Sequence, residues 1–392
     1  MKTYCKNVDI TDPETIMPWV FQALDHKWKK REFVRLILRY GRIGYHDLES
    51  DISSQRYAKR LTASQNIASE VARRIRMQDL RLSPLRAFQR VDGLSGKTRD
   101  LCKASPMQQI MDYVAVGALG ELLRAKIAPH QYASIPGRGQ EAGKVRLEKW
   151  IRGDKQSRHA IKGDVKKCYA SLTRKTVIRL LRRDIGKNKT LLWFVDNLLR
   201  THSKVTSGMA IGSYLSQWLC NYALSYLYRY ADGLHRIRRR KNGTEQRVRL
   251  VRHILFYMDD FILIGPRAAD VEKAMRLVST FALEKLGLSI KQERQRIDLQ
   301  HGSVDMMGFV VGYLRTTIRR RIFRRLRRQF LRAAKDLEQI GFIPFWRARK
   351  IASYNGYFKH TDTHTAAERL QVGRISRAAG RSIAFAERKG IA

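Results

Sequence analysis

The stretch that decides the fold is HILFYMDDFILI, residues 253–264. Two short apolar arms flank two adjacent acids, Asp259 and Asp260. Apolar arms of this length around a polar turn predict a β-hairpin whose tip carries the carboxylates. Carboxylates at the tip of a buried hairpin cost free energy unless they are paired or bind a metal ion. The stretch therefore predicts a metal-binding turn between two buried strands.

A second acid, Asp164, ends the short strand-like run AIKG at residues 160–163. Mg²⁺ prefers oxygen ligands and usually takes one or two carboxylates together with substrate phosphates. Two such ions about 4 Å apart can activate a 3′-hydroxyl and stabilise the oxygens of a leaving pyrophosphate. Asp164 and Asp259 at adjacent strand ends would supply the ligands. Alone, Asp164 also fits a turn or helix-capping aspartate, so the prediction depends on the acidic hairpin as well.

The charge of the chain points to nucleic acid. Its 392 residues carry 78 Lys and Arg against 35 Asp and Glu, a net charge of +43. Phosphate neutralisation makes nucleic acid the first partner to consider, and a membrane surface the second. With 44% hydrophobic residues and only 8 Pro, a disordered polycation is excluded. No apolar run is long enough to span a membrane and no signal peptide is evident, so we expect a cytoplasmic protein without a membrane partner.

The four cysteines are widely spaced and form no C-x-x-C pair. Neither a zinc knuckle nor a disulfide framework is expected. Elsewhere, apolar spacing predicts helices over 20–40, 57–77, 107–127, about 140–151, 174–183, 191–199, a segment ending near 230, and 271–286. Residues 82–106 contain Gly and Pro at turn positions and predict turns. Asn242-Gly243 between β-compatible arms predicts a further hairpin, and Gly287 predicts a helix end.

A basic amphipathic helix is predicted near the C-terminal part of the chain. Ile318, Ile322, Leu326 and Phe330 recur every four residues, and arginines between 319 and 328 cover the other faces. The same pattern is typical of a solvated helix or one lying on a membrane surface. The pattern alone does not choose between these and nucleic acid.

Together these motifs resemble a reverse transcriptase. Tyr257-Met258-Asp259-Asp260 resembles the YxDD box of that family, and the DVKKCY run at 164–169 resembles its first palm motif. The resemblance implies an α+β right-hand polymerase fold (fingers, palm and thumb) with an antiparallel palm sheet. It implies Asp164, Asp259 and Asp260 as catalytic, and these with Val165 as positions that bind two Mg²⁺ ions, with Mn²⁺ as an alternative. Tyr169 would block the sugar 2′-hydroxyl and so select dNTPs.

Other motifs follow in the family's order. The GKTRDL segment at 96–101 resembles the part of the fingers whose cations contact the triphosphate, here Lys97 and Arg99. The loop at 132–140, with Arg138, resembles one that lies near the template. In the LGLSIKQER segment at 286–294, Lys291 is the candidate proton donor to pyrophosphate, since Arg does not give up its proton. Gly308 and Phe309 resemble the primer grip, and Arg321, Arg325 and Arg328 fall in the thumb.

One segment points to a subgroup. Most reverse transcriptases have Q-G-x-x-x-S-P where this chain has IGSYLSQ at 211–217, so Ile211, Gly212 and Gln217 are the predicted nucleotide contacts. This form, and the SYNGYFKHT segment at 353–361, resemble the reverse transcriptases of diversity-generating retroelements. Those enzymes copy a template-repeat RNA into cDNA with errors opposite adenine. The resemblance implies the RNA, the cDNA, dNTPs and a small basic ring-forming accessory protein as partners.

Alternatives are a retron, group II-like or defence-type reverse transcriptase, or a non-catalytic RNA-binding protein on the same fold. The motif order predicts a domain division. Residues 1–80 form an N-terminal helical extension of the fingers, 81–158 the fingers, 159–231 and 250–313 the palm, 232–249 a basic hairpin insertion, and 314–392 the thumb and C-terminal tail. About 130 residues follow the acidic box, so no RNase H domain is expected.

Overall fold

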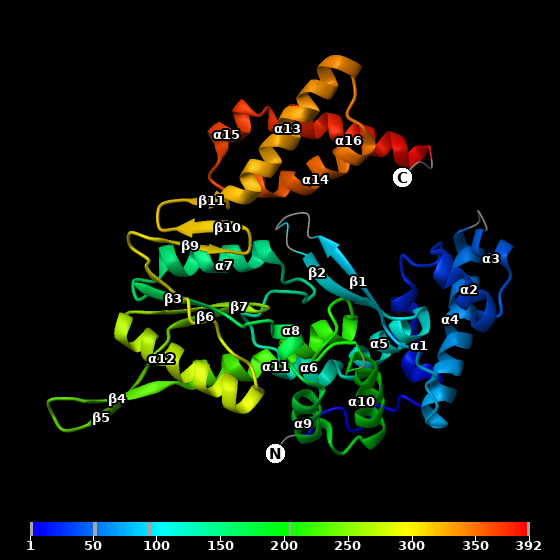
Figure 1. Cartoon of the computed structure of the whole chain (residues 1–392), viewed down its shortest axis with the longest axis horizontal. Coiled ribbons are helices and arrows are strands. Elements are labelled where there is room, and N and C mark those ends of the chain that lie inside the picture. The colour runs from blue at the N-terminus through cyan, green and yellow to red at the C-terminus, as the bar shows by residue number, and fades with distance from the viewer. Residues whose placement is uncertain (1–2, 50–52, 92–95, 97, 204, 390–392) are drawn as a thin grey trace. The chain divides into compact units, whose positions relative to one another are not determined.

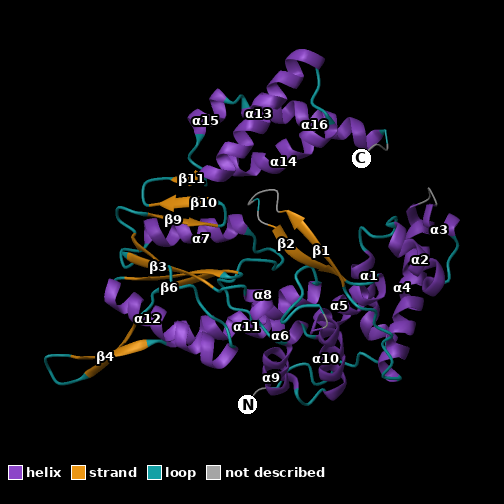
Figure 2. Ribbon diagram, in the orientation of Figure 1, coloured by secondary structure: helices purple, strands orange, loops and turns teal. Residues whose placement is uncertain are grey.

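The computed structural model describes the chain except residues 1–2, 50–52, 92–95, 97, 204 and 390–392. It forms two compact units, one of Met1–Ser134, Asp164–Gly233 and Arg276–Gln292, the other of Ile135–Gly163, Leu234–Met275 and Glu293–Ala392. Helices and strands are mixed in the chain, as the α+β prediction requires (Figure 2).

The N-terminal helices of the first unit pack around a common apolar core. They are α1 (Pro13–Leu24), α2 (Arg31–Gly41), α3 (Tyr45–Glu49) and α4 (Ser53–Arg76), drawn in blue in Figure 1. Asp12 caps α1 by accepting hydrogen bonds from the backbone N–H groups of Glu14 and Thr15. Apolar side chains of α4, among them Ile67 and Val71, are fully buried, and α4 contacts both α1 and α2.

The single helix expected over 20–40 is wrong, because two helices occupy that stretch. α1 ends at Leu24, where Asp25 has an extended ψ of 136°, and His26 then takes a left-handed φ of 56°. The linking residues 25–30 are polar apart from Trp28. A continuous helix would therefore have no continuous apolar face to bury.

The turn-rich stretch 82–106 contains a hairpin that the sequence did not indicate. β1 (Arg86–Val91) and β2 (Thr98–Lys103) pair antiparallel in a six-residue register. All of β1 and most of β2 are exposed. Because no face of this ribbon is buried, its sequence carries no apolar alternation from which to predict strands.

The next helix of the first unit is α5 (Pro106–Ala118), which contacts α1, α2, α10 and α11. Ser105 caps α5. The predicted helix 107–127 breaks at Leu119, and α6 (Gly120–Lys126) follows it. The others are α8 (Cys168–Ser171), α9 (Arg174–Ile185), α10 (Lys189–Ser203) and α11 (Tyr214–Gly233). α12 (Ala268–Phe281) begins in the second unit and ends in the first, where it runs into a π-helical turn, η1 (Ala282–Leu286), which ends at Gly287 with φ 68°, as predicted.

The second unit is built on a four-stranded sheet in the order β6-β7-β3-β8. Its strands are β6 (His253–Tyr257), β7 (Asp260–Gly265), β3 (His159–Asp164) and β8 (Gln295–Asp298). β6 pairs antiparallel with β7, and β3 with β8. The hairpin predicted from residues 253–264 is confirmed. Its arms are almost wholly buried, with the rings of Phe256 and Phe261 stacked at 4.8 Å between centroids.

Two further sheets belong to this unit. β9 (Ser303–Met306), β10 (Phe309–Gly312) and β11 (Thr316–Ile318) form one in the order β11-β10-β9. β4 (His235–Arg239) and β5 (Glu245–Arg249) form the hairpin predicted around Asn242-Gly243, which is confirmed. α7 (Gln140–Gly153) contacts both β6 and β10. Its Trp150 stacks on His253 at 4.5 Å between ring centroids.

The last four helices pack on one another: α13 (Arg320–Ile340), α14 (Phe345–Lys359), α15 (His364–Arg369) and α16 (Val372–Arg388). The predicted basic amphipathic helix is confirmed in α13, which buries Ile322, Leu326 and Phe330. Ile318 lies in β11 instead, because the helix begins two residues later. Over the residues with described positions, no helix is long and apolar enough to cross a membrane.

Candidate active site

The turn between β6 and β7 presents Asp259 to solvent. The strand register runs to Tyr257↔Asp260, so Met258 and Asp259 form the two-residue turn. Met258 has a left-handed φ of 54° and a buried side chain, whereas Asp259 is exposed. The two arms fix the position of the turn. The sequence thus places one acid on a tight turn and the next at the start of a buried strand.

The end of β3 lies beside the start of β7. A Cβ on Gly163 would lie 2.4 Å from Cζ of Phe261, so glycine is what permits this approach. Lys162 Nζ lies 3.6 Å from Asp260 Oδ1 and donates to the carbonyl oxygen of Asp305 at 3.1 Å. Asp164 directly follows Gly163 as the last residue of β3, and Asp260 is the first residue of β7, the neighbour of β3 in the strand order.

Asp164 is joined to the segment around Lys291. Lys291 Nζ lies 2.9 Å from Asp164 Oδ1, and its backbone N–H donates to the Asp164 carbonyl oxygen at 2.9 Å. Val165 forms a β-bridge with Ile290, and its side chain is fully buried. The structure therefore brings together two stretches that the sequence separates by more than a hundred residues.

The carboxylates suit Mg²⁺ in donor type, because all are hard oxygen ligands. Each of Asp164 and Asp260 has a lysine ammonium nearby, which balances the negative charge of the acids. Within the described ranges, no three His, Cys, Asp or Glu side chains are grouped as metal ligands.

The 211–217 segment is held firmly against its neighbours in the first unit. Cys102 of β2 donates its backbone N–H to the Ile211 carbonyl oxygen at 2.7 Å. Gly212 has φ 109°, and a Cβ there would lie 2.4 Å from the Cys102 carbonyl oxygen. Ser213 Oγ donates to Asp112 Oδ2 at 2.9 Å. These contacts therefore fix the position of the 211–217 segment relative to β2, the strand that carries Arg99.

Tyr169 belongs to the same network. It lies in α8 and is partly exposed, and its carbonyl oxygen accepts the backbone N–H of Met209 at 2.8 Å. Ser207 Oγ donates to the Ala170 carbonyl oxygen at 2.9 Å. Three predicted nucleotide contacts, Tyr169, Ile211 and Gly212, are thus tied through one loop. Lys97 lies outside the described residues.

A pocket of about 440 Å³ lies beside this segment. Gly212 and Gln217 line it, whereas Ile211 does not. Its wall includes the stacked rings of Tyr113 and Tyr214, 4.0 Å apart between centroids. Residues of the N-terminal helices and their linker also contribute, namely Lys27, Lys30 and Glu32. No sequence motif indicates a role for these three residues, because only the fold brings them near the 211–217 segment.

Asp112, also in this pocket, is a buried acid that the sequence did not single out. Burial raises its pKa to about 7, and the hydrogen bond from Ser213 and the charge of Lys27 oppose that rise. Because the folded-state pKa lies above the unfolded value, the charged carboxylate is penalised in the fold. The free energy of unfolding therefore falls as the pH rises from about 4 to about 7, and the loss is complete above pH 7.

Replacing Asp112 with Asn should therefore raise the free energy of unfolding by a few kcal/mol at pH 8. The gain should shrink at pH 5, where the native carboxyl is already neutral. Denaturant unfolding at the two pH values measures both. If the gain in the free energy of unfolding were the same at pH 5 and pH 8, it could not come from removing a buried charge at Asp112.

The predicted template and primer contacts lie in the second unit. Arg138 closes a turn with Ile135, N to O 3.0 Å, and Gly137 in that turn has φ 72°. Gly308 lies at the tip of the β9–β10 hairpin with φ 90°, whereas Phe309 is only 1% exposed and packs on Tyr357. A contact from the Phe309 ring to a primer is thus not available in this structure. On α13, Arg321 and Arg328 are exposed and Arg325 partly so.

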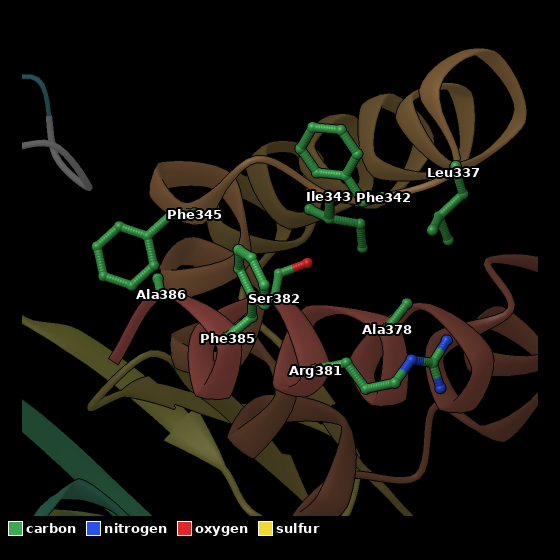
Figure 3. A pocket seen from close by; sticks show the side chains of 10 residues that line it. Leu337, Phe342, Ile343, Phe345, Ala378, Arg381, Ser382, Phe385 and Ala386 are labelled. Atoms are coloured by element: carbon green, nitrogen blue, oxygen red, sulfur yellow. The ribbon is translucent and has the colours of Figure 1, made fainter. Parts of the chain in front are cut away.

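A pocket lies among α13, α14 and α16 (Figure 3). It has a volume of about 580 Å³ and is lined mainly by apolar side chains of α13, α14, α16 and the α13–α14 link, including Phe342, Ile343 and Phe385. Arg381 and Ser382 are its polar members. None of the described residues that line it is an acid.

Two residues that shape the acidic end of the sheet were missed from sequence. Lys162 pairs with Asp260, and Gly163 allows β3 to approach Phe261. A glycine inside a predicted strand is a known sign of close backbone approach. That signal was present one residue before Asp164. The sequence does not predict the ion-pair partner of Lys162, because that partner depends on which strand lies next to β3.

An acid-tipped hairpin beside a strand that ends in a third acid, in a strongly basic chain, defines a class of nucleotidyl-transfer enzymes. The family described as "Reverse transcriptase (RNA-dependent DNA polymerase)" matches residues 92–311, and the chain belongs to it. The protein is thus an RNA-directed DNA polymerase, which implies an RNA template and dNTP substrates, and its family has the right-hand polymerase fold. A comparison with curated proteins found no match.

Proposed function

We propose that Asp164, Asp259 and Asp260 form the catalytic centre of this reverse transcriptase. The observation that carries the proposal is the strand order, in which β3, ending at Asp164, is the neighbour of β7, which begins at Asp260 directly after Asp259. In the reaction, the primer 3′-oxygen bonds to the α-phosphorus of a dNTP as the bond to pyrophosphate breaks. Two Mg²⁺ or Mn²⁺ ions held by these acids and the Val165 carbonyl would activate that oxygen and neutralise the pyrophosphate.

Other residues of the chain would position the nucleotide. Arg99, with Lys97, would bind the triphosphate through charged hydrogen bonds. Tyr169 would exclude a 2′-hydroxyl by contact with C2′. The Lys291 ammonium, beside Asp164, would donate a proton to the leaving pyrophosphate. The network that joins β2, α8 and the 211–217 segment supports a common nucleotide site.

Primer extension on a defined RNA with Mg²⁺ and dNTPs tests the function directly. We expect template-dependent cDNA that requires all four dNTPs. Binding of the RNA without extension would support the non-catalytic alternative. Extension without a template would support a defence-type enzyme.

The finer proposal is that the enzyme serves a diversity-generating retroelement, copying a template-repeat RNA with adenine-directed errors. The Ile211-to-Gln217 sequence supports it. We assign the fingers to 81–158 with 1–80 as their helical extension, the palm to 159–231 and 250–313, and the thumb to 314–392. A cytoplasmic enzyme of bacterial or phage origin with a small basic ring-forming accessory protein goes with this proposal.

Replacing Ile211 with Gln should lower misincorporation opposite template adenine by roughly tenfold, since a polar contact that checks pairing is worth about 1–3 kcal/mol. Deep sequencing of the cDNA gives the error rate at each template base. Ile211→Val, which keeps an apolar side chain, is the matched control and should leave the spectrum unchanged. An unaltered adenine error rate in the Gln variant would reject a role for Ile211.

A further inference from the structure

The β4–β5 hairpin projects away from the four-stranded sheet of its unit (Figure 1). Five residue pairs, from His235↔Arg249 to Arg239↔Glu245, hold it. At the tip, Arg240 donates its backbone N–H to the Thr244 carbonyl oxygen at 2.9 Å, and Gly243 has φ 78°. Its residues are exposed or partly exposed throughout. A lone two-stranded ribbon is only marginally stable in water, so this one would gain from a partner.

The hairpin concentrates positive charge. Residues 235–249 contain seven Lys and Arg and a single acid, Glu245. Cross-strand partners share a face of the ribbon, so Arg247 lies on one face opposite Ile237, and Arg238 on the other opposite Gln246. Both faces therefore present guanidinium groups. Glu245 pairs with Arg239, Nε to Oε1 3.4 Å.

Contacts with the rest of its unit anchor the ribbon at its base. Arg236 Nε lies 3.2 Å from Asp270 Oδ2, and Leu250 donates its backbone N–H to the Leu234 carbonyl oxygen at 2.9 Å. The chain then enters β6 at His253, whereas the acidic turn follows the other end of β6. The hairpin and Asp259 thus lie at opposite ends of that strand, about 17 Å long at 3.4 Å per residue.

We propose that the β4–β5 hairpin binds the phosphate backbone of a double-helical segment of RNA, separate from the duplex at the acidic turn. Guanidinium forks on both faces match phosphate oxygens, and double-stranded RNA is recognised mainly through its shape and backbone. The ribbon offers few apolar anchors for a membrane or a protein partner. A net charge of +43 also exceeds what the roughly ten phosphate contacts of one duplex would use.

The proposal rests on the proposed function only in taking RNA as the natural template. The triple variant Arg238→Ala/Arg240→Ala/Lys241→Ala tests it, because these residues lie at or near the exposed tip and leave the anchoring Arg236 intact. Binding to an RNA stem-loop of about 16 base pairs is measured over a series of salt concentrations. We expect about tenfold weaker binding at low salt and a log–log slope smaller in magnitude by about 2 to 3.

The charge-matched control is Arg182→Ala/Lys187→Ala/Lys189→Ala, three exposed cations around the α9–α10 connection of the other unit. It should retain most of the stem-loop affinity. An unchanged slope in the hairpin variant, or an equal loss in the control, would overturn the proposal. An equal loss on single-stranded RNA of the same length would overturn the duplex assignment.

Extension of a short primer–template separates this proposal from the catalytic one. The hairpin variant should extend it at the rate of the unaltered protein, because its substitutions lie far along β6 from Asp259. Failure of the unaltered protein to extend would count against the catalytic proposal alone. Loss of extension in the hairpin variant, with its unfolding temperature unchanged, would place the hairpin at the polymerase site and contradict a separate contact.

Discussion

Replacing Asp259 with Asn is expected to slow DNA synthesis on an RNA template by about 10³-fold or more. Asn keeps the size of the side chain but removes the charge that would bind a divalent ion. The residue is exposed on the two-residue turn of the β6–β7 hairpin, so the buried arms of that hairpin should be unaffected. Single-turnover primer extension with saturating dNTP gives the rate of the chemical step.

The matched control is Asp298→Asn, an acid in the same sheet. Asp298 pairs with His159 at the start of β3, the opposite end of that strand from Asp164. The Asp298→Asn protein should extend primers at a rate within about twofold of the unaltered protein's, because surface substitutions away from a site have small effects. An Asp259→Asn protein that still made cDNA at the unaltered rate would refute its assignment as a metal ligand.

Much of the acidic end of the sheet was predictable because its signals are local. The two apolar arms and the acids between them identify a hairpin without reference to the rest of the chain, and β6 and β7 match it. Asn242-Gly243 identifies the β4–β5 hairpin in the same way. The apolar stripe of α13 identifies its buried face.

Features that depend on tertiary contacts were not predictable. β1 and β2 carry no apolar alternation because the ribbon buries neither face, so they resembled turns. The pairing of Lys291 with Asp164 requires the β-bridge between Val165 and Ile290. The burial that raises the pKa of Asp112 arises from the packing of α5 among several helices. None of these can be read from the spacing of residues in one segment.

Replacing Gly163 with Ala should impair both folding and catalysis, although it adds a single methyl group. The new Cβ would lie 2.4 Å from Cζ and 2.7 Å from Cε1 of Phe261. That ring is fully buried and stacks on Phe256, so it has little room to move. β3 must therefore shift relative to β7, which displaces Asp164 from the turn that carries Asp259.

We expect the free energy of unfolding to fall by about 1–3 kcal/mol, as is typical of overpacked cores. The rate of extension should fall by about 10²-fold, the effect of misplacing a reacting group by about 1 Å. Denaturant unfolding and single-turnover extension measure the two quantities separately. Gly153→Ala, at the end of α7 where a Cβ would meet nothing within 4 Å, is the matched control and should change neither.

A second substitution distinguishes displacement of the acids from general damage. Phe261→Leu in the Gly163→Ala background removes the ring atoms that the new Cβ would meet, and should restore part of both stability and rate. The two substitutions should therefore be strongly non-additive, as expected for side chains in direct contact. Additive losses would show that the strand end does not depend on this contact, and that the position of Asp164 is set elsewhere.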